Sequence, residues 1–106
     1  MSSQMFHLHA EVCKTLSHAK RLEILSILRD EEMSVSEIVD TMRVPAANVS
    51  QHLAVLRKSG ILATRRDGKN IYYRISNRKV IKACDLMREV LIEQHSQKGK
   101  LLRIPA

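Results

Sequence analysis

The sequence contains few cysteines and no long apolar run. Its 106 residues include only Cys13 and Cys84, without CxxC or CxxH spacing, so neither a disulfide scaffold nor a structural zinc knot is expected. No run of about 18 apolar residues is present, and the polar N-terminus does not resemble a secretory leader. A glycine-rich phosphate loop, a nucleophile motif and paired carboxylates in an apolar setting are also missing. We therefore expect a reduced, cytoplasmic, single-domain chain that is not an enzyme, has no cofactor and does not enter a membrane.

Basic residues are plentiful and clustered. The formal net charge is +7, and the segment 57–79 is rich in Lys and Arg, with Asp67 as its only acid. Such clustering favours a polyanionic partner, although a solvated basic face has the same composition.

Apolar residues at helical spacing predict two helices near the N-terminus, over 4–16 and 18–30, and both are interpreted as core helices. Ser17 is the expected N-cap of the second helix. Ser34 followed by Glu37 forms a capping-box pattern, which predicts a short third helix over 35–42.

A tight turn is expected after this third helix. Pro45 restricts Val44 to extended geometry and fits the first turn of a following helix, so the two helices form a helix-turn-helix. In the second helix Val49, Leu53 and Leu56 recur at i, i+4 and i+7, which predicts an inward stripe that ends before Gly60.

The opposite side of that helix carries small and polar residues followed by cations. A major groove about 12 Å wide admits a helix with small residues, hydrogen-bonding side chains and terminal positive charge. An ordinary amphipathic surface helix is the alternative. The predicted contacts to double-stranded DNA on this helix are Ala46, Ala47, Ser50, Gln51, His52, Arg57 and Lys58.

A β-hairpin is predicted over 61–75, with Asp67-Gly68 as a type I′ turn and Ile71, Tyr73 and Ile75 facing inward. Its tip is rich in polar and cationic residues, as expected for a wing along a DNA backbone. The predicted wing contacts are Arg65, Arg66, Lys69 and Asn70.

A long final helix is predicted over 78–95. Its apolar stripe contains Val80, Cys84, Met87 and Leu91, and one small domain does not need so long an apolar face for its own core. We therefore predict a homodimer, and a two-fold protein of this kind predicts an imperfect palindromic DNA site.

The order of these segments and their amino-acid sequences resemble the ArsR/SmtB family of bacterial repressors across roughly residues 10–92. The segments that carry the resemblance are "LSHAKRLEILSIL", "MSVSEIVDTM", "NVSQHLAVLRKSGIL" and "RRDGKNIYYRI". The resemblance implies a mainly α-helical fold with a two-stranded β-hairpin wing, a winged helix-turn-helix that we assign to residues 1–96. The basic C-terminal segment contains Gly and Pro and shows no clear period, so a flexible tail is expected over 97–106. The resemblance also implies a homodimer paired through the first and last helices, which represses an operon until an inducer binds. The dimerisation residues expected on this basis are Met5, Leu8, Val12, Val80, Cys84, Met87 and Leu91.

The usual metal sites of the family have no matching ligands here. Ser34 and Ser36 occupy positions where a thiolate sensor has cysteines. On the last helix, the ligand positions are occupied by Asn77, Lys79, Val90 and Glu93, and neither Lys79 nor Val90 can bind zinc, nickel or cobalt. No metal site is therefore predicted at either place.

Three interpretations of Cys13 and Cys84 remain open. The two cysteines are small buried hydrophobes, or they form a reversible disulfide, or their thiols bind a soft metal or metalloid together with His9 or His7. The predicted sensing residues are Cys13, Cys84 and His9. A winged-helix architectural or protein-binding module without inducer sensing is the alternative function.

Overall fold

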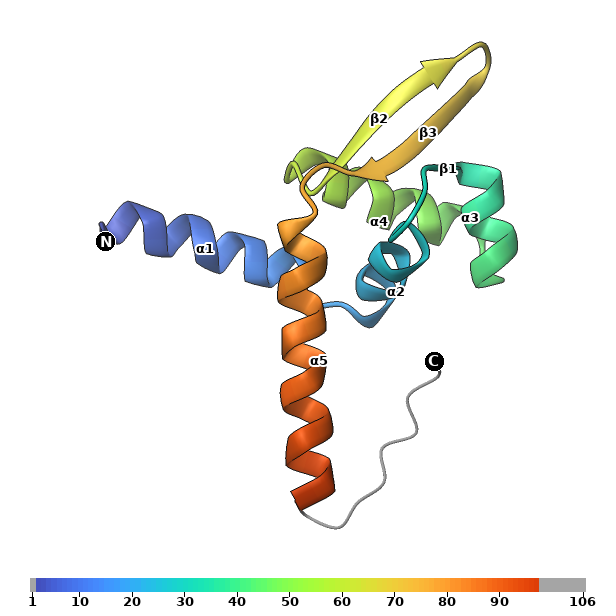
Figure 1. Ribbon diagram of the computed structural model, residues 1–106. Coiled ribbons are helices and arrows are strands. Elements are labelled where there is room, and N and C mark those ends of the chain that lie inside the picture. The colour runs from blue at the N-terminus through green and yellow to red at the C-terminus, as the bar shows by residue number, and fades with distance from the viewer. Residues whose placement is uncertain (1, 98–106) are drawn as a thin grey trace.

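The computed structural model describes residues 2–97, which form five helices and a small antiparallel sheet (Figure 1). The helices are α1 (Ser3–Thr15), α2 (Ala19–Ile27), α3 (Val35–Met42), α4 (Ala46–Lys58) and α5 (Lys79–Gln97), and the strands are β1 (Met33–Ser34), β2 (Leu62–Asp67) and β3 (Asn70–Ile75). This order confirms the mainly α-helical fold with a hairpin wing. The tail expected over 97–106 lies, beyond Gln97, outside the described residues.

The core lies where α2, α3 and α4 meet the base of the hairpin. Val49, Leu53 and Leu56 of α4 are fully buried, which confirms the inward stripe. The other buried apolar side chains come from α2 and its end, α3, the hairpin base and α5: Ile24, Leu25, Leu28, Ile38, Ile61, Leu62, Ile75 and Ile81. Each fully buried side chain of this size contributes about 1.5–3 kcal/mol relative to exposure.

Local hydrogen bonds determine both ends of α3. The Ser34 hydroxyl accepts from the Glu37 N–H at 3.3 Å, and the Glu37 carboxylate accepts from the Ser34 N–H at 3.0 Å, which confirms the capping box. The backbone hydrogen bond from Ser34 is the main reason that the pKa of Glu37 is lowered. At the other end Arg43 adopts a left-handed conformation, with φ 57° and ψ 38°, and turns the chain towards α4. Pro45 is the N-cap of α4, just outside the helix in which it was expected.

The end of α4 is a Schellman motif. The Gly60 N–H donates to the Arg57 carbonyl at 3.0 Å, and the Ile61 N–H donates to the Leu56 carbonyl at 3.1 Å. Gly60 has φ +85°, a conformation that glycine adopts without a Cβ clash. This geometry confirms the predicted helix stop and directs the chain into β2.

The hairpin differs from the prediction in three respects. Asp67 pairs with Asn70, so the turn residues are Gly68 and Lys69, and only Gly68 has a positive φ. The turn therefore fits type II′ and not type I′. Ile71 is 37% exposed because it lies near the turn, beyond the reach of the core. β1 adds an unpredicted third strand, in the order β1-β3-β2, because Met33 and Ser34 are too few residues to show alternation.

The start of α2 also corrects the prediction. His18, and not Ser17, occupies the N-cap position, and its side chain makes no capping hydrogen bond. Ser17 instead donates its hydroxyl hydrogen to the Lys14 carbonyl at 2.6 Å, at the end of α1. A serine between two helices can satisfy either one, and here it satisfies the preceding helix.

The interpretation of α1 as a core helix is wrong for the single chain. α1 contains no buried residue, and Met5, Leu8 and Val12 are 48%, 57% and 38% exposed. In Figure 1, α1 extends away from the rest of the chain. The predicted stripe on α5 divides in the same way, because Val80 and Cys84 pack against the core whereas Met87 and Leu91 are exposed.

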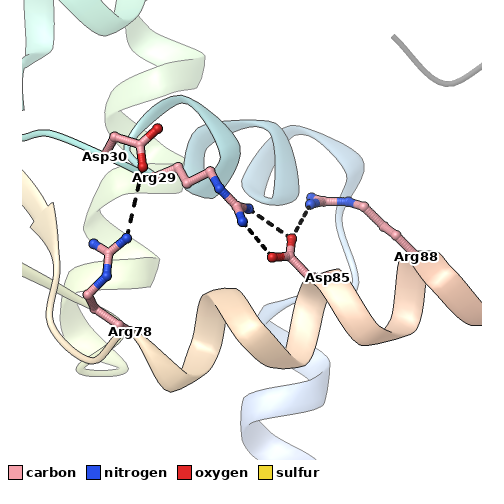
Figure 2. A network of polar contacts seen from close by, with 5 residues as sticks. All are labelled: Arg29, Asp30, Arg78, Asp85 and Arg88. Carbon is pink, nitrogen blue, oxygen red and sulfur yellow. Dashed lines mark hydrogen bonds and ion pairs between the residues drawn. The ribbon is translucent and has the colours of Figure 1, made fainter. Parts of the chain in front are cut away.

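Ion pairs attach α5 to α2 (Figure 2). Arg29, just after α2, donates two hydrogen bonds to Asp85 at 2.8 and 2.5 Å, and Arg88 lies 3.5 Å from the same carboxylate. The bidentate hydrogen bond from Arg29 lowers the pKa of Asp85. Arg78, just before α5, lies 4.0 Å from Asp30. Within residues 2–97, no helix is long and apolar enough to cross a membrane.

We expect Arg43→Gly to stabilise the fold. A residue with a Cβ is destabilised by about 1–2 kcal/mol in the left-handed region. Glycine avoids this strain, but part of the gain is lost because glycine has more conformational freedom in the unfolded chain. The net gain in the free energy of unfolding should be about 0.5–1 kcal/mol, measured by urea unfolding at fixed protein concentration. Arg43→Ala is the control, because it removes the same side chain but keeps the Cβ. An equal gain from both variants contradicts the assignment to backbone strain.

Candidate nucleic-acid interface

The outward face of α4 is small and polar, as predicted. Ala46, Ala47, Ser50 and Gln51 are all exposed, opposite the buried stripe. Asn48 is also exposed, and its amide can read base edges as a glutamine amide does. Asn48 directly precedes the buried Val49, and consecutive helical residues point about 100° apart. The helical period alone therefore places Asn48 outside the inward stripe.

The N-terminus of α4 faces the wing. Pro45 gives the helix no side-chain cap, and the Asn48 N–H donates to the Pro45 carbonyl at 3.0 Å. The N–H groups of Ala46 and Ala47 are therefore the ones that can donate to an anion such as a DNA phosphate. A groove joins Ala46 at this end to Lys69 and Asn70 of the wing. Asp40 also lines the groove, and its carboxylate disfavours a phosphate directly beside it. The structure thus brings together three of the residues that the sequence predicted to contact DNA: Ala46, Lys69 and Asn70.

The cations of the wing have different surroundings. Arg66 and Lys69 are exposed, and neither forms an ion pair with another residue in the described part of the chain. Arg65 instead donates from Nε to Glu32 at 2.7 Å, and its guanidinium lies 4.6 Å from the centre of the Tyr72 ring. The hydrogen bond from Arg65 lowers the pKa of Glu32, and the same contact raises the pKa of Arg65. Arg65 therefore attaches the wing to the loop before β1.

Arg74 is a basic wing residue that the predicted contacts omitted. It lies on β3 opposite Ala63, two pairs along the strands from Arg65 and Tyr72, and it is exposed. Its place in the basic segment 57–79 was the available sequence signal.

The basic end of α4 lies towards α1 and not towards the wing. Lys58 lines a groove with Leu8 and Val12 of α1 and with Val55 and Ser59 of the α4 end. Arg57 is exposed. The predicted set therefore spans two regions of α4, an N-terminal region beside the wing and a C-terminal region beside α1.

His52 is half-buried, and its Nδ1 accepts a hydrogen bond from Arg21 Nε at 3.2 Å. The His18 and His52 ring centres are 6.0 Å apart. Burial, followed by the charges of Arg21 and His18, lowers the pKa of His52. Its Nδ1 is therefore engaged within the protein.

The two thiols have different environments. Cys13 is exposed on α1, whereas Cys84 lines a small pocket with Leu25 and Ser26 of α2, Arg29, Ile81 and Arg88. Both thiols are free, and no α1 residue lines that pocket. His9 is exposed on α1.

Two residues at the family's metal positions have structural roles here. Ser34 caps α3, and Asn77 accepts from the Lys79 N–H at 2.9 Å at the start of α5. Val90 is 43% exposed and offers no ligand atom. Within residues 2–97, no group of three or more His, Cys, Asp or Glu side chains is placed to hold a metal ion.

Known proteins share this arrangement. Residues 18–64 match the family described as "Bacterial regulatory protein, arsR family". The HTH-type transcriptional regulator Rv0081 of Mycobacterium tuberculosis is 34% identical over 102 residues, covering 95% of this chain and 90% of that protein. The chain belongs to the ArsR family. Like other ArsR-family proteins, it is a DNA-binding transcriptional regulator and not an enzyme.

Other ArsR-family members agree in sequence and fold. The crystal structure of Rv0081 superposes with a TM-score of 0.82, covering 92% of this chain and 99% of that one. The transcriptional repressor BigR from Xylella fastidiosa gives a TM-score of 0.73 at 33% identity, covering 85% of this chain and 96% of that one. The regulator KmtR of M. tuberculosis is 47% identical over 70 residues, which are 66% of this chain and 54% of KmtR. The match therefore spans about half the length of KmtR.

We expect Lys69→Ala to weaken binding to all duplexes alike. Removing one phosphate contact should reduce the slope of log affinity against log salt by about one unit, measured by fluorescence anisotropy at several salt concentrations. Arg65→Ala is the comparison, because the guanidinium of Arg65 is bonded to Glu32 and its loss should leave the slope nearly unchanged. An equal reduction for both variants assigns Arg65 to a phosphate after all.

Proposed function

We propose that this regulator is a homodimeric repressor that binds an imperfect palindromic operator in the bacterial cytoplasm and leaves it when an inducer acts. The observation that carries the proposal is the division of α4. The helix buries Val49 and Leu53 and exposes Ser50 and Gln51 beside a basic wing. A helix held in this way presents hydrogen-bonding groups to base edges while the wing contacts the backbone.

Exposed apolar side chains support the homodimer. Met5, Phe6 and Leu8 on α1 are each about half exposed or more, and Leu86 and Met87 on α5 are each 61% exposed. Soluble monomers rarely leave contiguous apolar surface of this kind in water. A second copy of the chain, packed against α1 and α5, removes it from water.

Two-fold symmetry supports the palindromic operator. Each protomer of the proposed dimer offers one α4, and the two helices must enter successive major grooves on one side of the duplex, about 34–36 Å apart. The repressing action follows the BigR relative, which is named as a transcriptional repressor.

The operator is tested by selecting bound duplexes from a random pool. We expect the selected duplexes to share an imperfect palindrome, bound about 10³-fold more tightly than a scrambled duplex. Gln51→Ala should relax the base preference, because the amide can no longer hydrogen-bond a base edge. Gln94→Ala, which removes a glutamine from exposed α5, is the matched control. Similar affinity for every duplex indicates an architectural module instead.

The homodimer is tested at Met87. Met87→Asp places a carboxylate in the proposed apolar interface, and we expect it to shift the protein from dimer to monomer at micromolar concentration in analytical ultracentrifugation. Lys82→Asp is the control, since it adds the same carboxylate on another side of α5. A wild-type monomer that binds the selected operator with full affinity refutes the proposed dimer.

We further propose that the inducer acts through thiol chemistry on Cys13 and Cys84. The two residues lie on α1 and α5, the helices proposed to pair, so a covalent change there can alter the spacing of the two recognition helices. A disulfide requires Cα atoms about 4.4–6.8 Å apart, so bond formation requires the two helices to approach. Binding of a soft metal or metalloid by the same thiols, with His9, is the competing mechanism.

The thiol proposal is tested with stoichiometric hydrogen peroxide, which is reduced to water as two thiols lose two hydrogens and form a disulfide. We expect intact mass to fall by two hydrogens per chain and operator affinity to fall with it. Cys13→Ser and Cys84→Ser should each abolish both changes. Retention of both changes in either variant assigns sensing elsewhere.

A further inference from the structure

Arg21 connects three helices, α1, α2 and α4. Its side chain is half-buried at the start of α2, and its Nη1 donates to the carbonyl of Thr15, the last residue of α1, at 3.0 Å. From the same guanidinium, Nε donates to His52 Nδ1 on α4 at 3.2 Å. One planar group therefore holds the end of α1 and the middle of α4 in a fixed relation.

This contact determines the state of the His52 ring. Arginine has only donors, so Nδ1 must be the acceptor and the ring hydrogen must lie on Nε2 of a neutral imidazole. Protonation of Nδ1 removes the only acceptor that Arg21 has on α4 and places two cations face to face. Burial, followed by the charges of Arg21 and His18, lowers the pKa of His52, so the ring is neutral at pH 7.

The surroundings of His52 allow its titration to be separated from that of other groups. Arg21 and His18, both at the start of α2, are the charged or titratable neighbours identified around the ring within residues 2–97. α1 contributes the uncharged Thr15 carbonyl through Arg21. His18 makes no capping hydrogen bond to α2, so it can be replaced without loss of a helix cap.

We propose that Arg21 is a positioning residue of the DNA interface, which holds the recognition helix α4 against the end of α1 through the neutral His52 ring and makes base reading sensitive to acid. His52 directly follows Ser50 and Gln51 on α4, so a shift of the ring moves the base-reading side chains. The inference depends on the proposed role of α4 and goes beyond it by assigning the residue that orients the helix. Because α1 is part of the proposed dimer interface, the same contact transmits the position of the partner to the DNA.

The sign of the pH effect follows from the two protonation states. A histidine with a lowered folded-state pKa stabilises the bonded arrangement above pH 6.5, and this contribution is lost as the pH falls through the lowered value. The new positive charge on His52 strengthens binding to every duplex alike. The ratio of operator affinity to scrambled-duplex affinity removes that general effect, so it reports helix position.

The test measures this ratio from pH 7.5 down to the lowest pH at which circular dichroism shows the native fold, with the duplex selected above and its scrambled form as probes. We expect the wild-type ratio to fall about tenfold, as for the loss of one buried hydrogen bond. His52→Asn keeps an acceptor near the position of Nδ1 but cannot titrate, so its ratio should stay constant. His18→Asn should retain the wild-type fall.

A second pair of variants tests Arg21 directly. Arg21→Gln should lower the ratio about tenfold at pH 7.5 and remove its pH dependence, whereas Lys20→Gln removes the same charge next to it and should behave as wild type. If His52→Asn loses preference on acidification as wild type does, or Arg21→Gln keeps the wild-type ratio, the positioning role is wrong. A wild-type protein without preference at pH 7.5 refutes the recognition role of α4 itself, and the two failures are thus distinguished.

Discussion

Burial of Val49, Leu53 and Leu56 against α2 and α3 is the constraint on which the other features depend. These three fully buried side chains determine the rotation of α4 about its own axis, and therefore which residues face outward. A substitution that removes a methyl group from one of these side chains leaves a cavity and allows the helix to shift. The exposed positions of Ser50 and Gln51 are thus a consequence of core packing.

Electrostatic contacts then connect this packed centre to its projecting parts. The segment 29–32, which follows α2, reaches α5 through Arg29 and Asp85 and reaches the wing through Glu32 and Arg65. Exposed ion pairs contribute little to stability individually, with about 0–1 kcal/mol as the usual range. Their role here is geometric. The bidentate Arg29–Asp85 pair fixes the direction in which α5 leaves the core, and the contact of Arg65 with one carboxylate oxygen of Glu32 attaches the wing.

Local sequence signals predicted much of the centre of the fold. The capping box at Ser34, the inward stripe of α4 and the stop at Gly60 each depend on residues within a few positions of one another, so the sequence expresses them directly. Arg65 could not be assigned in this way, because its partner Glu32 is 33 positions away. The exposure of α1 was missed for a related reason: helical periodicity identifies an apolar face but does not show whether the same chain covers it.

In the proposed dimer, the absence of buried residues in α1 makes the folding of this helix, and with it operator binding, depend on the amount of the protein in the cell. If a partner supplies the surface on which α1 rests, then folding of this helix and assembly are one equilibrium, governed by mass action. Occupancy of the operator then rises more steeply than linearly with the number of copies. A regulator built in this way has a threshold of expression, set by the exposed apolar area of two helices.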